Sequence, residues 1–88
     1  MDRTARLKRL HFRAWHRGTR EADLMIGGFF DCNAPRWSDD EIAWYEALIE
    51  EQDVDIMAWA IGARPAPARY QGKMMRRLQT LDYIKHPE

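Results

Sequence analysis

Helical periodicity runs along almost the whole chain, and it is interrupted at Gly18. Leucine and alanine side chains recur three or four positions apart up to residue 14, and a second apolar stripe follows residue 21. Gly18 lies between the stripes, where a sharp corner needs a positive φ that glycine adopts at little cost. The pattern predicts two helices, over residues 3–16 and 19–31, that meet at a glycine corner.

Apolar residues at the same spacing predict three further helices. The first opens with a capping box formed by Ser38 and Glu41. The second is interpreted as capped by Asp53 and terminated at Gly62. A Pro-Ala-Pro connector separates it from the third, because each proline removes a hydrogen-bond donor and favours extended backbone before it. These helices are expected over residues 38–51, 54–61 and 68–84.

The predicted fold class is all-α, a compact single-domain bundle of five short helices over residues 1–88. A chain of 88 residues has a small core, so large side chains must supply much of the buried area. We therefore expect Tyr45, Leu48 and Trp59 to be core residues. Gly27 and Gly28 lie inside the second predicted helix, where glycine is unfavourable. Either a neighbouring helix packs closely there or the helix ends early.

The charge is neutral overall but unevenly distributed. Residues 1–20 carry a net charge of +6, residues 21–56 a net charge of −10, and residues 57–88 a net charge of +4. Such a pattern can steer partners by complementary potential. The alternative is that these charges only solvate helix faces.

A search for catalytic or metal-binding patterns finds none. His11 and His16 fall on different helical faces, so they suggest no metal site. The single cysteine, Cys32, excludes an internal disulfide and is interpreted as a small buried or half-buried residue. No apolar run approaches the length of a membrane span, so no membrane insertion is expected. The sequence predicts a binding protein that is not an enzyme and holds no metal or stable cofactor of its own.

The corner between the first two predicted helices is the candidate site. His16, Arg17, Gly18, Arg20 and Glu21 crowd a stretch with few apolar side chains to cover it. A polar, directional surface of this kind suits recognition better than catalysis. The alternative is structural: Arg17 and Glu21 would complement helix dipoles, or pair weakly across the turn.

Three sequence blocks resemble the SdhE family of flavoprotein assembly factors. The first is Trp-His-Arg-Gly-Thr-Arg-Glu-Ala-Asp-Leu at residues 15–24, which contains the family signature R-G-x-x-E. The second is Tyr-Glu-Ala-Leu-Ile at residues 45–49, and the third is Asp-Val-Asp-Ile from residue 53, with Trp59 and Gly62. The signature alone is weak, but the ordered blocks are specific and cover nearly the whole chain.

The resemblance implies an assembly chaperone for the flavoprotein subunit of succinate dehydrogenase, and in some bacteria of fumarate reductase. Such a protein promotes covalent attachment of FAD to its client, and FAD is not its own cofactor. By this resemblance Arg17 and Glu21 are recognition residues, with His16 and Arg20 beside them, and Gly18 permits the corner. The chain is expected to be a monomer in the bacterial cytoplasm, mature from its first residue.

Two other classes of function stay open. The arginines between Arg3 and Arg20 could lie along the phosphates of a nucleic acid, although the neutral overall charge and the acidic middle argue against nucleic acid as a partner. A toxin-neutralising role is the second alternative, because relatives of this family have also carried that label.

Overall fold

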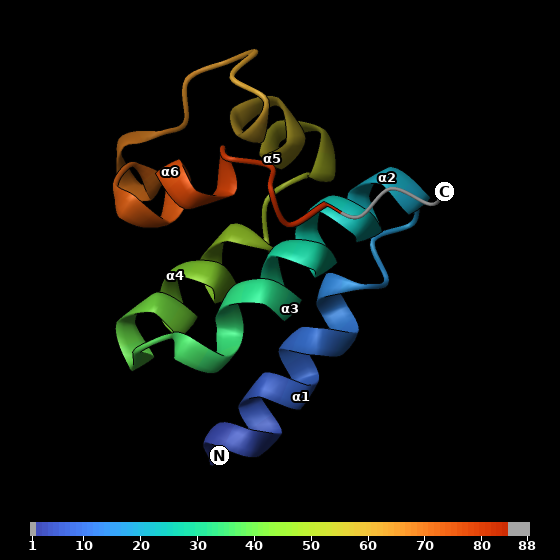
Figure 1. Ribbon diagram of the computed structural model, residues 1–88, viewed down its shortest axis with the longest axis vertical. Helices are drawn as coiled ribbons and strands as arrows, with labels where there is room; N and C mark the ends of the chain where they lie inside the picture. The colour runs from blue at the N-terminus through green and yellow to red at the C-terminus, as the bar shows by residue number, and fades with distance from the viewer. Residues whose placement is uncertain (1, 85–88) are drawn as a thin grey trace.

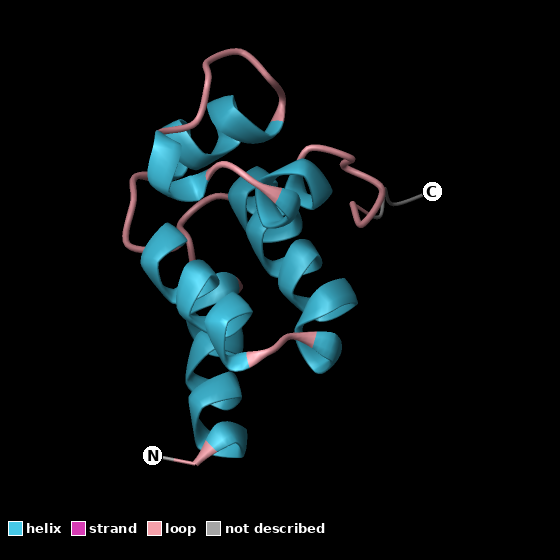
Figure 2. Cartoon of the chain, turned by 90° about the vertical axis from the view of Figure 1, so that its left-hand side faces the viewer, coloured by secondary structure: helices cyan, strands magenta, loops and turns pink. Residues whose placement is uncertain are grey.

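Helices account for all the regular secondary structure in the computed structural model, which describes residues 2–84 (Figures 1 and 2). The α-helices are α1 (Arg3–Ala14), α2 (Arg20–Ala22), α3 (Gly28–Asn33), α4 (Asp39–Leu48), α5 (Asp53–Ala60) and α6 (Lys73–Leu78). A π-helix, η1 (Asp23–Gly27), joins α2 to α3, and two 3-10 turns complete the set, η2 (Ala34–Arg36) and η3 (Ala68–Tyr70). Because α2, η1 and α3 are continuous, five helical segments result, and the predicted all-α bundle is confirmed.

The helices form a compact body around an aromatic core. The radius of gyration is 12.3 Å, near the ~12 Å expected for a compact domain of this length. In Figure 1, α1, α3 and α4 occupy one end of the molecule, and α5 and α6 occupy the other. Tyr45 of α4 packs on Trp37 with ring centroids 4.9 Å apart, and it also contacts Phe29 and Phe30 of α3. Its hydroxyl donates to the carbonyl oxygen of Ile26 at 2.8 Å, which satisfies the polar atom in the core.

The predicted core residues are buried, whereas the interpretation of Cys32 is wrong. Tyr45, Leu48 and Trp59 expose 0%, 1% and 6% of their surface. Cys32 is exposed, because α3 turns Phe29 and Phe30 toward the core and leaves Cys32 on its outer side. Cys32 is exposed because its place in the helical repeat directs its side chain away from the core, although cysteine is an apolar residue.

The two adjacent glycines mark close contacts along an unbroken helix. A Cβ on Gly27 would lie 2.4 Å from Cδ2 of Trp15, the residue that ends α1. A Cβ on Gly28 would lie 3.2 Å from the carbonyl oxygen of Tyr83. Close packing is therefore the correct alternative for this pair. The neighbour of Gly27 is the residue that caps α1, whereas the neighbour of Gly28 is Tyr83, which lies outside any helix and not in a packed helix as expected.

Several predicted boundaries are corrected. The first helix ends at Ala14 and not at residue 16, because Trp15 caps it and the chain then turns at Gly18. Gln52, and not Asp53, is the N-cap of α5, so Asp53 is left free for another role. The capping box of Ser38 and Glu41 at α4 is confirmed.

The predicted helix over 68–84 is wrong in its extent. Only η3 and α6 are helical there, because Gly72 has φ +138° and Leu81 has φ +58°, and neither value fits a right-handed helix. Tyr70 closes η3 and is buried beside Trp59, with ring centroids 5.6 Å apart. The broken segment therefore returns an aromatic side chain to the core.

A methyl group at Gly27 tests the close contact with Trp15. We expect Gly27→Ala to destabilise the protein by about 1–3 kcal/mol, because overpacking outweighs the gain in helix propensity. Urea unfolding, followed by tryptophan fluorescence and far-UV circular dichroism, measures the change. A variant as stable as the wild type would show that Trp15 does not pack on this helix.

Candidate partner-binding site

The corner that joins α1 to α2 is fixed by backbone conformation and by local hydrogen bonds. Gly18 has φ +110°, as predicted, and nothing lies within 4 Å of the position that its Cβ would occupy. Thr19 caps α2, since its hydroxyl oxygen accepts a hydrogen bond from the amide of Ala22 at 3.2 Å. The Asp23 carboxylate accepts a hydrogen bond from the amide of Arg17 at 2.7 Å. The turn is thus closed from both sides of Gly18.

The side chain of Arg17 points into the protein and connects three segments. Its Nε donates to Oδ1 of Asp53 at 2.9 Å, and its Nη2 donates to the carbonyl oxygen of Ile49 at 2.9 Å. Nη1 also reaches the carbonyl oxygen of Arg13, at 3.4 Å. The Arg17 side chain is 11% exposed and that of Asp53 is 27% exposed. The guanidinium therefore joins the end of α1 to the junction between α4 and α5.

The other signature residues are exposed. The Arg20 and Glu21 side chains form no hydrogen bond or ion pair with any residue in the range 2–84. His16 lies on the surface, where its Nδ1–H donates to the carbonyl oxygen of Phe12 at 2.6 Å. Its ring stacks on Phe12 at 3.9 Å between centroids. The sequence pattern grouped Arg17 with Glu21, but their surroundings differ. Arg17 forms hydrogen bonds within the protein, whereas the Glu21 side chain faces solvent.

The structural alternative for this pair is therefore only partly supported by its geometry. Glu21 lies in the first turn of α2, where its negative charge interacts favourably with the positive end of the helix dipole. Arg17 and Glu21 do not pair across the turn; Asp53 is the carboxylate partner of Arg17.

The basic side chains of α1 pair with the acidic middle of the chain. Arg6 holds Glu46 by two hydrogen bonds of 2.9 and 2.6 Å, and this bidentate contact keeps the pKa of Glu46 below its usual value. Arg3 pairs with Asp39, and Arg13 pairs with Glu50. Much of the uneven charge of the sequence is thus paired within the molecule, between α1 and the segment formed by α4 and the turn after it.

Within residues 2–84, no group of three or more histidine, cysteine or acidic side chains is placed to hold a metal ion. In the same range, no helix is long and apolar enough to cross a bilayer. At the corner, a backbone held by these hydrogen bonds presents the side chains of His16, Arg20 and Glu21 to solvent.

Fold and site together define a small all-α protein with a tightly held polar corner. Residues 8–82 match the family model described as flavinator of succinate dehydrogenase. The chain belongs to this family of flavination factors.

Similar proteins carry consistent names. The chain is 40% identical over 74 residues to "FAD assembly factor SdhE" of Acetobacter pasteurianus, a match covering 84% of this chain and 68% of that protein. It is 33% identical over 72 residues to "Succinate dehydrogenase assembly factor 2, mitochondrial" of Cryptococcus neoformans, covering 81% and 41%. A protein of the same name in Drosophila grimshawi is 33% identical over 85 residues, covering 94% and 56%. The chain thus spans about half the length of these mitochondrial relatives.

Two participants in the corner were not recognised from the sequence. Asp53 was interpreted as a helix cap, and its pairing with Arg17 joins residues 36 positions apart. Phe12 is an apolar residue outside the stripe made by Leu10 and Ala14, and it is 61% exposed. The displaced apolar residue was a usable signal for Phe12, whereas no local pattern could reveal the pairing of Asp53.

Stability measurements separate the two arginines of the signature. We expect Arg17→Ala to destabilise the protein by about 2–3 kcal/mol, because it leaves Asp53 and the Ile49 carbonyl oxygen without their partner. Arg20→Ala is the matched control, since it removes an exposed arginine two residues after Gly18. We expect it to change the free energy of unfolding by no more than about 0.5 kcal/mol. Equal losses of unfolding free energy in urea would contradict the internal role of Arg17.

Proposed function

We propose that this protein binds the flavoprotein subunit of succinate dehydrogenase and promotes covalent attachment of FAD to that subunit. The observation that carries the proposal is the family match over residues 8–82, which includes the whole R-G-x-x-E corner. We also propose a fumarate reductase flavoprotein as a second client. The bacterial cytoplasm and a monomeric state remain predictions that rest on the family resemblance.

The geometry supports a division of labour within the corner. Arg17 is a positioning residue, because its guanidinium donates hydrogen bonds to Asp53 and to backbone carbonyl oxygens of the same chain. Arg20 and Glu21 carry charges with no internal partner in the described chain, so both are available to a client. Charge-assisted hydrogen bonds at a partly desolvated interface give directional recognition.

An exposed aromatic pair directly precedes the corner in the sequence. Phe12 is 61% exposed and stacks with His16, directly before the signature. Large aromatic side chains are common anchors of protein interfaces, because burying their apolar surface away from water is favourable. We place Phe12 and His16 beside Arg20 and Glu21 in the client-binding surface.

Nucleic-acid binding is the less favoured alternative. Arg3, Arg6, Arg13 and Arg17 of the basic stripe each form an ion pair with an acidic residue of this chain. Phosphate contacts would have to compete with those pairs. No observation favours the toxin-neutralising alternative.

Flavin fluorescence tests the proposal. The flavoprotein subunit is produced with each variant in a bacterial host that lacks its own flavination factor, and covalent flavin is read in denaturing gels. The wild-type protein should restore the fluorescent band. Glu21→Ala should reduce the rate of flavination about tenfold or more while remaining folded, because a charge-assisted contact at the interface is lost.

Asp40→Ala is the matched control. Asp40 occupies the second position of α4 as Glu21 does in α2, and it is likewise exposed. It should therefore reproduce any general effect of removing a first-turn carboxylate, and flavination should stay at the wild-type rate. A wild-type protein that does not restore the band would overturn the proposed function. Normal flavination with Glu21→Ala and with Arg20→Ala would overturn the assignment of the surface.

A further inference from the structure

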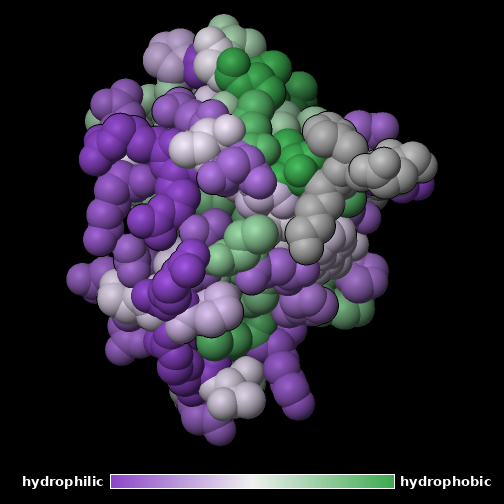
Figure 3. Space-filling view, viewed as in Figure 1, coloured by the Kyte–Doolittle hydropathy of each residue, from purple (hydrophilic) through white to green (hydrophobic). Residues whose placement is uncertain are grey.

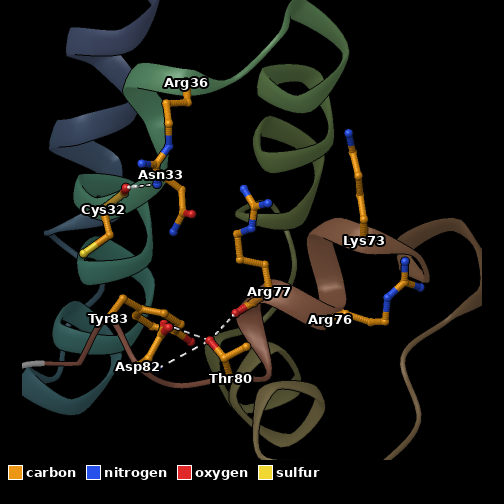
Figure 4. A pocket seen from close by; sticks show the side chains of 9 residues that line it. All are labelled: Cys32, Asn33, Arg36, Lys73, Arg76, Arg77, Thr80, Asp82 and Tyr83. Atoms are coloured by element: carbon orange, nitrogen blue, oxygen red, sulfur yellow. Dashed lines mark hydrogen bonds between the residues drawn. The ribbon is translucent and has the colours of Figure 1, made fainter.

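A basic hollow lies between α3 and α6, formed by residues that are not part of the signature (Figure 4). Its volume is about 580 Å³, and it is wide open to solvent. Arg36 reaches into it from η2, and Arg77 reaches into it from α6. Lys73 and Arg76 stand along its α6 side. Four cationic residues from two separate elements thus line one space, and in Figure 4 the Arg77 guanidinium points into it while that of Arg76 points away from α3.

The ion pairs of the chain make this concentration of charge unusual. Six of the eleven arginines form ion pairs within residues 2–84. Five do not, and three of those five line the hollow: Arg36, Arg76 and Arg77. In a chain of zero net charge, positive charge without an internal partner is therefore gathered at one place. Figure 3 shows strongly hydrophilic residues over the side of the molecule that carries α6.

The existing contacts of these side chains leave most of their donors free. Arg36 donates one hydrogen bond, to the carbonyl oxygen of Cys32 at 3.1 Å. Lys73 pairs with Glu41 at 3.2 Å, outside the hollow. Within the described chain, the Arg76 and Arg77 side chains form no hydrogen bond. A guanidinium carries five N–H donors in a planar fork that matches phosphate or carboxylate oxygens.

We propose that this hollow binds a phosphate-bearing anion, and specifically a diphosphate group. A diphosphate concentrates several negative charges in a small volume, which suits cations that approach one space from two sides. An acidic polypeptide would need a row of cations along a groove, and it would meet the Asp82 carboxylate at the edge of the hollow. Asp82 accepts a hydrogen bond from Thr80, and as the one acidic lining residue it weakens the site for any anion.

Titration of the isolated protein with inorganic pyrophosphate tests the site, with binding measured by calorimetry and by amide chemical shifts. Saturable binding is expected, with shifts at α6 and η2. The double variant Arg76→Ala/Arg77→Ala should raise the dissociation constant about tenfold or more, because two charge-assisted contacts are lost. Asp82→Asn should lower it about two- to threefold by removing a like charge. Circular dichroism confirms that each variant is folded.

The matched control is Arg9→Ala/Arg20→Ala, which also removes two exposed arginines that form no ion pair within residues 2–84. Its dissociation constant for pyrophosphate should change by less than about threefold, as expected for a loss of general charge. Absence of binding at millimolar pyrophosphate, or equal loss in the two double variants, would overturn the proposal. Tighter binding of hexaglutamate through Arg76 and Arg77 would also overturn it, in favour of an acidic protein segment. The titration involves no client, so its outcome is independent of the proposed function.

Discussion

One guanidinium, that of Arg17, holds together the parts of the molecule that the corner needs. Its hydrogen bonds reach the end of α1, the residue that caps α4 and the first residue of α5. The amide of the same residue is bound by Asp23, which lies beyond the corner in η1. Because both ends of Arg17 are fixed, Gly18 can turn the chain without leaving the turn mobile. The direction in which Arg20 and Glu21 face solvent follows from this arrangement.

Ion pairs join α1 to α4 and to the turn that follows α4, and they stabilise the packing of α1 in the same way. Each surface pair contributes little stability on its own, but several in a row favour one orientation of α1 on α4. The strongly basic start and acidic middle of the chain therefore serve mostly to dock two helices. The surfaces proposed for binding are local: the exposed groups of the corner, and the basic hollow beside α6. The net charges of the three sequence segments alone would have suggested a broader binding surface, because they do not show which charges pair with each other.

The sequence predicted those features that depend on local spacing. Apolar periodicity located five helices, the capping box located the start of α4, and Gly18 located the corner. Features that depend on contacts between distant segments were out of reach. The pairing of Arg17 with Asp53 spans 36 residues, and no local pattern encodes it. The segment after residue 67 was predicted as one helix because its apolar spacing resembles one, but positive φ values at Gly72 and Leu81 divide it.

The candidate site was found by resemblance and refined by geometry. R-G-x-x-E placed Arg17 and Glu21 together as recognition residues, but only contact distances and exposed fractions reveal that Arg17 faces inward. Packing also explains Gly27, whose α-carbon lies under the Trp15 ring. The functional role of the corner rests on the family match, and its structural role rests on the contacts of Arg17.

A double-mutant cycle between Arg17 and Asp53 tests the central claim, that the corner is anchored by their pairing. The free energies of unfolding of Arg17→Ala, Asp53→Ala and the double variant are measured in urea at low ionic strength. Removing the second partner should cost much less than removing the first, with a coupling energy of at least about 1 kcal/mol. Strictly additive losses, within about 0.3–0.5 kcal/mol, would contradict the account, because they would mean that the two side chains do not stabilise each other in solution.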